Sequence, residues 1–249
     1  MREIVFIISA PSGSGKSTLT AELRKVVDHL EFSISYTTRP PRGGEQTGRE
    51  YFFVTKDEFE RMIREDAFLE HANVFGNYYG TARRFLREAE ARGNDLLLDI
   101  DVQGAAQVKK KLLESVSIFI LPPSREELER RLRTRARADD NLQRQLQGDE
   151  AGRFNTEEII QRRLQTASRE IENFGEYDYI LVNDRLEQSI DILRSIVEAE
   201  RLCRSGAPPK PQEESVLRTA ERARRPQMMP EVQSILATFD LSRSHTVTE

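Results

Sequence analysis

Short apolar runs alternate along the chain with segments whose apolar residues recur at helical spacing. Four of these runs, at residues 4–8, 95–101, 116–121 and 179–182, are nearly continuous rather than alternating. A short continuous run of aliphatic residues is typical of a strand that is buried on both faces. Because segments with helical spacing separate these strands, the pattern predicts an α/β fold with a parallel sheet covered by helices on both faces.

Helical spacing predicts six helices, and Ser124 followed by Glu127 forms a capping box at the start of the charged one. The expected helices cover residues 18–30, 82–92, 102–113, about 124–137, 156–174 and 186–203. Two stretches interrupt the alternation, at roughly residues 35–81 and 131–168. Within or beside the first, we expect strands at 32–36, 51–54, 68–75 and 78–81 and a helix at 56–66. Within the second, residues 139–155 show no apolar period.

The composition changes at residue 205, where a Ser-Gly-Ala-Pro-Pro segment begins. Residues 205–249 are mostly polar with interspersed prolines, which predicts a linker and a poorly ordered C-terminal tail. Residues 230–239 keep a weak helical register. This segment is interpreted either as a transient helix or as a segment that docks on the core.

A glycine-rich motif between the first apolar run and the first helix is the most specific signal in the chain. It consists of Ala10, Pro11, Ser12, Gly13, Ser14, Gly15, Lys16, Ser17 and Thr18. The strand before it and the helix after it favour a phosphate-binding loop over a flexible Gly-Ser linker. In such a loop, backbone N–H groups and the helix N-terminus surround phosphate oxygens. Lys16 would contact the β- and γ-phosphates of ATP, and the Ser17 hydroxyl would bind Mg²⁺.

Composition excludes several other classes of protein. The chain has 249 residues, a net charge of -4 and a single cysteine, Cys203. The acidic balance argues against nucleic-acid and membrane partners, and one cysteine cannot form an internal disulfide. The run at residues 4–8 is too short for a signal peptide or a membrane span. We therefore expect a cytoplasmic protein.

Several further motifs, in order, resemble those of guanylate kinase. They are the phosphate-loop segment 9–18, Ser-Tyr-Thr-Thr-Arg-Pro-Pro-Arg at 35–42, Gly-Arg-Glu-Tyr-Phe-Phe-Val at 48–54, Gly-Asn-Tyr-Tyr-Gly-Thr at 76–81 and Leu-Asp-Ile-Asp-Val-Gln-Gly at 98–104. The resemblance covers residues 3 to about 203. It implies a guanylate kinase domain at 1–204, with its core at 1–34, 82–130 and 169–204, a GMP-binding insertion at 35–81 and a lid at 131–168. The segment 136–155 is longer than the usual lid of this family, and the tail has no counterpart that we could place.

The resemblance also implies roles for individual residues. Those that would hold the GMP phosphate are Arg39, Arg42, Tyr51 and Tyr79, and those that would recognise the guanine are Ser35, Glu70, Thr81 and Asp99. Asp101 would lie near Mg²⁺ and the phosphates, and Asn183 near the adenine of ATP. The lid would bring Arg131, Arg135 and Arg163 to the transferred phosphoryl group. The implied reaction transfers the γ-phosphoryl group of ATP to GMP, and to dGMP, and yields ADP and GDP in purine nucleotide metabolism.

The sequence also allows other interpretations of several of these residues and of the function. Arg130–Arg137 also fits an exposed helix face or a small nucleic-acid patch, and Glu70 fits a surface carboxylate. The individual roles of Asp99 and Asp101 stay open, because they depend on whether the strand ends there. Two other functions compete with the kinase: a phosphopeptide-binding module of the same fold, which would lack the loop lysine, and a kinase for a phosphorylated sugar, which would not need acceptors for guanine.

Overall fold

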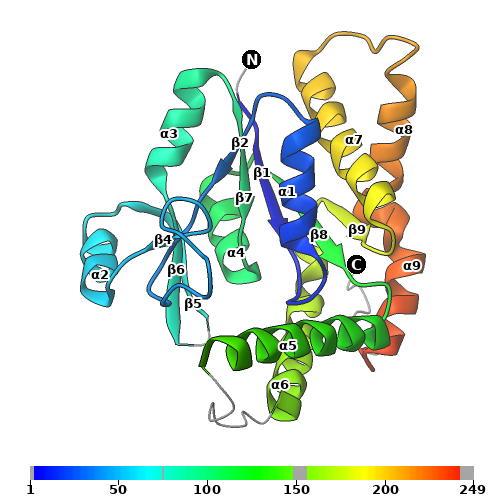
Figure 1. The fold of residues 1–249 in the computed structure, drawn as a ribbon. Coiled ribbons are helices and arrows are strands. Elements are labelled where there is room, and N and C mark those ends of the chain that lie inside the picture. Colours follow the sequence, from blue (N-terminus) through cyan, green and yellow to red (C-terminus); the bar gives the residue numbers. More distant parts are fainter. Residues whose placement is uncertain (1–2, 75, 148–155, 242–249) are drawn as a thin grey trace.

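A five-stranded parallel sheet, in the order β2-β7-β1-β8-β9, forms the centre of the molecule (Figure 1). The computed structural model describes residues 3–74, 76–147 and 156–241. The strands are β1 (Val5–Ser9), β2 (Leu30–Ser33), β7 (Asp95–Asp99), β8 (Val116–Leu121) and β9 (Tyr179–Val182). All four continuous apolar runs are therefore strands of this sheet, and the predicted fold class is confirmed.

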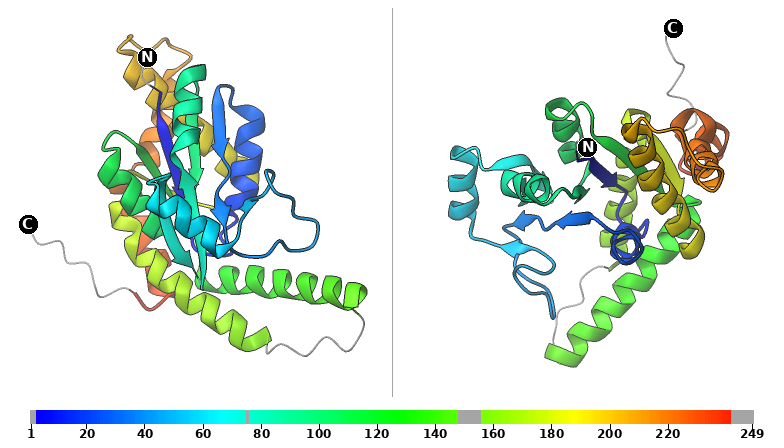
Figure 2. Two further views of the ribbon diagram at one scale, coloured as in Figure 1. Left: turned by 90° about the vertical axis from the view of Figure 1, so that its left-hand side faces the viewer. Right: turned by 90° about the horizontal axis from the view of Figure 1, so that it is seen from above.

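Helices cover both faces of the sheet, because alternate residues of each strand point in opposite directions. Val5 and Ile7 belong to one core, which α3, α4, α5, α6 and α9 cover, whereas Phe6 and Ile8 belong to the other, which α1, α7 and α8 cover. The two helix layers are separated in the right-hand view of Figure 2. Four of these helices are α1 (Lys16–Val26), α3 (Arg83–Arg92), α4 (Val102–Lys111) and α7 (Leu186–Ser205).

The predicted insertion forms a second, four-stranded sheet in the order β4-β3-β6-β5. Its elements are β3 (Tyr36–Thr37), β4 (Phe52–Phe53), α2 (Lys56–Arg64), β5 (Phe68–Val74) and β6 (Asn77–Ala82). The prediction of a single strand at 32–36 is wrong, because these residues belong to two strands, β2 and β3. Phe32 pairs with Leu97 in the central sheet, whereas Tyr36 pairs with Gly80 in the insertion. Local alternation cannot reveal this change of sheet, because both pairings are long-range.

Two helices form the predicted lid region: α5 (Arg125–Gln147) and α6 (Thr156–Ile171), the latter followed by the 3₁₀ turn η1 (Glu172–Glu176). The capping box is confirmed in part, since the N–H of Glu127 donates to the Ser124 hydroxyl at 3.2 Å. Helix α5 extends to Gln147, although residues 139–155 show no apolar period. Residues 139–147 contain neither glycine nor proline, so helix propensity is sufficient there. The rest of the predicted long lid, 148–155, lies outside the described residues.

The prediction of a poorly ordered tail is wrong for residues 214–241. They contain α8 (Glu214–Arg222) and α9 (Arg225–Thr238), and α9 buries Val232, Ile235 and Leu236 in the core that α5 and α6 share. Between the two helices, the chain runs along the free edge of β9, where the N–H of Ile180 donates to the Ala223 carbonyl at 2.9 Å. The docking interpretation of 230–239 is therefore the correct one. Residues 242–249 lie outside the described part.

No helix in the described ranges combines the length and the apolar character that crossing a bilayer requires.

Candidate active site

The glycine-rich motif connects β1 to α1, as the sequence predicts, and α1 begins at Lys16. Gly13 and Gly15 have φ angles of 96° and 89°, a region that residues with a Cβ rarely adopt. A Cβ on Gly15 would also collide with the amide of Asn183, and one on Gly13 would contact Leu128 at 2.9 Å. Both glycines are thus required by the backbone conformation and by close packing. The loop has the shape expected of a phosphate-binding loop.

Lys16 is paired within the protein. Its Nζ lies 2.5 Å from Oδ1 of Asp99 and donates to the Ile100 carbonyl at 3.0 Å. The Thr20 hydroxyl approaches the other oxygen of Asp99 at 3.4 Å. Asp99 is the last residue of β7, and β7 pairs with β1, so the strand order brings Asp99 beside the loop. Asp99 therefore belongs to the phosphate-loop side of the site.

Asp101 lies on the other side of the site, next to Glu70. It is the N-cap of α4, where its Oδ1 accepts the N–H of Gly104 at 2.8 Å. A Cβ on Gly104 would collide with the Glu70 carboxylate and lie 3.3 Å from Oδ1 of Asp101. Gly104 thus leaves room for the two carboxylates to approach each other. Thr81, which the sequence analysis predicts beside Glu70, is its partner across the β5–β6 ladder.

Glu70 is 3% exposed, so the alternative of a surface carboxylate is wrong. Burial, with a smaller contribution from the negative charge of Asp101, raises the pKa of Glu70 to about 7. The positive charge of Lys111 lowers this pKa only in part, so the carboxylate is a strong acceptor for the donors of a ligand.

The positions of Asp99 and Asp101 differ from those that their predicted roles imply. The sequence analysis assigns Asp99 to the guanine and Asp101 to the Mg²⁺ and phosphate region. In the structure, Asp99 contacts Lys16 of the phosphate loop and Asp101 lies beside Glu70. These contacts favour the reverse assignment. The two aspartates diverge because β7 ends at Asp99, whereas Asp101 already caps α4.

The predicted phosphate clamp of the insertion is assembled from three segments. The guanidinium of Arg39 is buried and lies 5.4 Å from the ring centre of Tyr51, and Tyr51 contacts Tyr79 edge-on at 5.8 Å. Both terminal nitrogens of Arg39 bind the Glu45 carboxylate, at 3.0 and 3.1 Å. The backbone N–H of Arg42 donates to the same carboxylate at 2.7 Å, while its side chain is exposed. Burial raises the pKa of Tyr51 to about 12, so its hydroxyl stays protonated and can donate.

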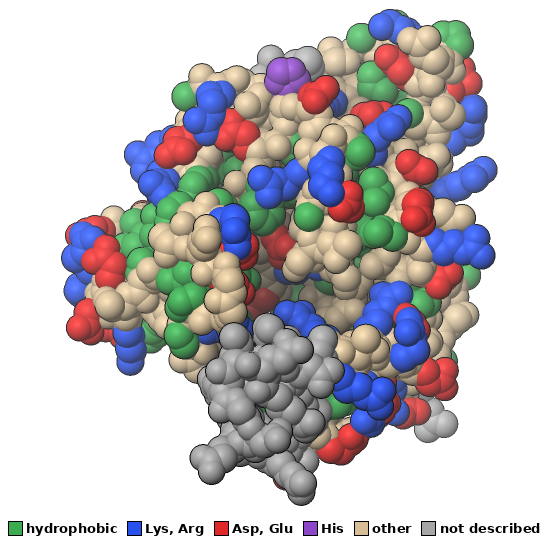
Figure 3. Space-filling view, in the orientation of Figure 1, with side chains coloured by type: hydrophobic (Ala, Val, Ile, Leu, Met, Phe, Trp, Pro, Cys, Tyr) green, Lys and Arg blue, Asp and Glu red, His purple; other side chains and the backbone are tan. Residues whose placement is uncertain are grey.

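A hollow separates the lobe that carries α2 from the body of the molecule, and acidic and basic side chains line it (Figure 3). Ser35 lies in the link between β2 and β3, and its carbonyl accepts the N–H of Phe52 at 2.9 Å. Across the described residues, no group of three or more His, Cys, Asp or Glu side chains is arranged to hold a metal ion.

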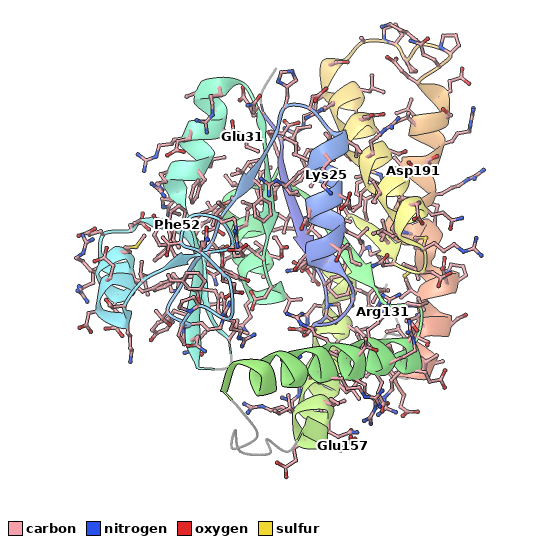
Figure 4. All side chains as sticks on the ribbon, in the orientation of Figure 1. Lys25, Glu31, Phe52, Arg131, Glu157 and Asp191 are labelled. Carbon is pink, nitrogen blue, oxygen red and sulfur yellow. The ribbon has the colours of Figure 1, made fainter. Side chains whose placement is uncertain are left out.

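The three predicted lid arginines have different surroundings. Arg131 binds Glu127 at 2.7 Å and donates to the Asn183 carbonyl at 3.0 Å, near the C-terminal end of β9 (Figure 4). Arg135 is exposed on α5, and Arg163 is half-buried on α6. Arg133 pairs with glutamates of both lid helices, which fits the exposed-face alternative for that part of α5.

The side chain of Asn183 contacts the backbone of the phosphate loop. This side chain is buried, and its Nδ2 donates to the Ser14 carbonyl at 2.8 Å. The sequence analysis expects this residue near the adenine of ATP, whereas the structure engages its amide with the loop backbone.

The sequence analysis missed two acidic residues near site residues. Glu45 neutralises Arg39, and Glu170 of α6 is a half-buried carboxylate whose pKa is raised by burial and lowered by the charge of Lys16. For Glu45, no pattern in its glycine- and proline-rich segment indicates the contact. For Glu170, a usable signal exists: it follows Arg163 by seven residues, which places both on one face of a helix.

Comparison with known proteins agrees with this geometry. The guanylate kinase family model matches residues 2–200. A guanylate kinase of Koribacter versatilis (strain Ellin345) is 56% identical over 239 residues, which are 96% of this chain and 97% of that protein. A guanylate kinase of Escherichia coli (strain K12) is 46% identical over 200 residues, 80% of this chain and 88% of that protein.

A solved structure leads to the same family. The crystal structure of guanylate kinase from Anaplasma phagocytophilum superposes with a TM-score of 0.62 at 33% identity and covers 80% of this chain and 86% of that one. The alignment with the Koribacter protein extends into the residues after 204, so the C-terminal segment has a counterpart in at least one relative, contrary to the expectation from sequence. The sequence, the phosphate loop and the fold lead to one conclusion: the chain belongs to the guanylate kinase family.

Proposed function

We propose that the two carboxylates Glu70 and Asp101 recognise the guanine of GMP, opposite a phosphate loop that holds ATP. The protein transfers the γ-phosphoryl group of ATP to GMP, and we extend this to dGMP because the proposed contacts do not involve the 2′-hydroxyl. The N1–H and N2 amino group of guanine are donors, and an ionised carboxylate only accepts. The observation that carries this assignment of the guanine site is the proximity of the buried Glu70 carboxylate to the half-buried Asp101.

Phosphoryl transfer requires two substrates held in line and neutralisation of charge on the transferred group. Lys16 is placed to supply positive charge to the ATP phosphates after leaving Asp99. Arg39 and Arg42, with the hydroxyls of Tyr51 and Tyr79, are suited to the dianionic phosphate of GMP. That phosphate is itself the nucleophile, so the reaction requires no general base. Closure of the insertion and the lid would exclude water.

The residues beside the loop fit a Mg²⁺ ion that arrives with ATP. The Ser17 hydroxyl is exposed on the first turn of α1, and Asp99 lies one turn away beside Thr20. Hydroxyl and carboxylate oxygens are ligands that Mg²⁺ prefers, and it commonly combines one or two of them with substrate phosphates. When bound, the ion would neutralise charge on the β- and γ-phosphates. We place this activity in the cytoplasm, where its nucleotide substrates occur.

A coupled assay of ADP release tests the guanine assignment with GMP, dGMP, AMP, CMP, UMP and ribose phosphates as acceptors. We expect turnover with GMP and dGMP and little with the others, because a site built to bind one base edge rejects bases without it by roughly 10⁴-fold. Glu70→Gln keeps the shape but turns a donor toward the donors of guanine. It should raise KM for GMP by about tenfold or more and narrow the GMP/AMP ratio in kcat/KM.

Asp57→Asn, on the exposed first turn of α2, is the matched control. It should leave the KM for GMP and the GMP/AMP ratio in kcat/KM unchanged. An unchanged GMP/AMP ratio in folded Glu70→Gln protein would contradict the guanine assignment. A preference for a ribose phosphate would instead favour the sugar-kinase alternative.

A further inference from the structure

The chain crosses between the central body (the five-stranded sheet with its covering helices) and the insertion at two places. The first crossing is residues 34–35, between β2 and β3, and the second is the junction of β6 with α3. Tyr36 directly follows the first crossing, and Arg84 and Phe85 lie in the first turn of α3 after the second. These three side chains therefore lie where the two parts of the molecule join.

Three aromatic rings form a stack that connects the two parts. Tyr36 of β3 stacks on Phe52 of β4 with 4.9 Å between the ring centres, and Phe52 stacks on Phe85 of α3 at 6.0 Å. Tyr36 packs against the small core of the insertion, whereas Phe85 packs against a core of the central body. Phe52, labelled in Figure 4, is the ring between them. The stack thus connects two separate cores.

The guanidinium of Arg84 lies over all three rings. Its central carbon is 4.7 Å from the ring centre of Phe85, 5.0 Å from that of Phe52 and 5.7 Å from that of Tyr36. Within such distances the face of an aromatic ring attracts a cation, and the planar guanidinium also stacks well on rings. A cation on α3 therefore holds two rings of the insertion.

The two edges of the insertion sheet are attached to the central body in different ways. The strand order β4-β3-β6-β5 places Phe52 and β5 at opposite edges. At β5, the side chain of Gln107 in α4 binds the N–H and the carbonyl of His71, at 3.3 and 2.7 Å. His71 directly follows Glu70, so the proposed guanine side has its own attachment. The stack under Arg84 is the attachment of the β4 edge.

The β4 edge carries groups that the proposed function assigns to GMP. Tyr51 directly precedes Phe52, and its ring lies 5.4 Å from the guanidinium of Arg39. The backbone N–H of Phe52 donates to the Ser35 carbonyl at 2.9 Å. A displacement of Phe52 would therefore shift the phosphate-binding groups relative to Glu70 at the opposite edge.

We propose that Arg84 is a positioning residue for GMP: its guanidinium, lying over the three stacked rings, fixes the β4 edge of the insertion against α3 and so sets the spacing between the phosphate-binding groups and the guanine carboxylates. The proposal rests on the proposed function, in which the insertion binds GMP. A nucleotide with a fixed distance between base and phosphate binds best when both ends of its site are held in place. The ATP side does not involve this edge, and the choice of base depends on Glu70 rather than on Arg84.

Substitutions at Arg84 separate its charge from the rest of the side chain. Arg84→Gln removes the charge, and Arg84→Lys keeps it. Arg84→Gln is also made in a Phe52→Leu background, where the central ring is absent. Exposed Arg87, three residues further along α3, provides the control Arg87→Gln. KM for GMP is measured at saturating ATP, KM for ATP at saturating GMP, and the GMP/AMP ratio in kcat/KM alongside. Circular dichroism melts establish that each variant is folded.

We expect Arg84→Gln to raise KM for GMP by about fivefold, the loss typical of an exposed contact between a cation and aromatic rings. KM for ATP, kcat and the GMP/AMP ratio should stay within about twofold of the wild type, as should every value for Arg84→Lys and Arg87→Gln. In the Phe52→Leu background, Arg84→Gln should add less than about twofold, because residues in contact do not contribute independently.

An unchanged KM for GMP in folded Arg84→Gln protein overturns the proposal, and so does an equal rise in KM for ATP. It is also overturned if Arg84→Lys is as impaired as Arg84→Gln, or if Arg84→Gln has its full effect without the Phe52 ring. A narrowed GMP/AMP ratio in Arg84→Gln would contradict the separation of Arg84 from the choice of base. Absence of GMP-dependent ADP release from the wild type would instead contradict the proposed function.

Discussion

The two halves of the active site differ in how their charges are balanced before a ligand binds. On the phosphate-loop side, Lys16 and Asp99 neutralise each other at 2.5 Å. On the proposed guanine side, the carboxylates of Glu70 and Asp101 lie together, and burial and the charge of Asp101 raise the pKa of Glu70 more than the charge of Lys111 lowers it. ATP must therefore displace an internal ion pair, whereas GMP supplies donors to two neighbouring carboxylates. The first half is stable alone, and the second carries a cost that its ligand relieves.

The largest effect should come from removing the cation of the phosphate-loop half. We expect Lys16→Ala to lower kcat by a factor on the order of 10² or more, because a fixed positive charge on the transferred phosphate is lost. The coupled ADP-release assay measures this, and circular dichroism should show that the fold is kept. Substantial residual turnover in the folded variant would contradict the role of Lys16 and weaken the contrast between the halves.

The C-terminal segment should stabilise the phosphate-loop half more than the guanine half. Val232, Ile235, Leu236 and Phe239 are at most 5% exposed, and the hydroxyl of Thr238 accepts the N–H of Arg125 at the start of α5. Truncation after Gly206 should lower the free energy of unfolding by several kcal/mol, since each buried side chain of this size contributes about 1.5–3 kcal/mol.

A chain ending at Leu241 is the control for this truncation and should melt like the full protein. In the truncated protein, KM for ATP should change more than KM for GMP, because the segment contacts α5 and β9. An unchanged melting temperature after truncation at Gly206 would show that α9 does not contribute to the core.

The stability that the fold loses by ionising Glu70 in the guanine half should depend on pH. The pKa of Glu70 is raised from 4.5 to about 7, so the folded protein holds this proton more tightly than the unfolded chain does. Ionisation therefore destabilises the ligand-free fold as the pH rises from about 4.5 to about 7, and the penalty is complete above 7. At about 1.4 kcal/mol per pKa unit, it is at most on the order of 3 kcal/mol.

Glu70→Gln removes this ionisation. Its melting temperature relative to the wild type should therefore rise between pH 5 and pH 7 and stay level above that, with GMP reducing the difference. If the difference in melting temperature between Glu70→Gln and the wild type is constant from pH 5 to pH 8, ionisation of Glu70 does not destabilise the free protein. The two halves of the site would then not differ in their stability before ligand binding.

The sequence pattern was sufficient to predict those elements whose interacting residues lie within one short segment. The strand at 4–8, the glycine-rich turn and the helix after it follow one another directly, so periodicity and turn chemistry predicted them and the nucleotide chemistry of Lys16. The capping interaction between Ser124 and Glu127 was also predicted, because its partners are three residues apart. The residues of the insertion were identified through the family resemblance, which the comparisons confirm.

Tertiary structure decided the features whose partners are distant in sequence. The chain after residue 205 looked disordered because its apolar residues had no visible partner, and α9 is buried only because α5 and β9 provide an apolar surface. The sequence left the individual roles of Asp99 and Asp101 open. In the structure, β7 ends at Asp99 beside Lys16, and Asp101 at the start of α4 lies beside Glu70. The charge of Lys16 acts on Glu170 across more than 150 residues of sequence. A helical or strand period records which face a side chain occupies, but the group it meets depends on packing, which brings distant segments into contact.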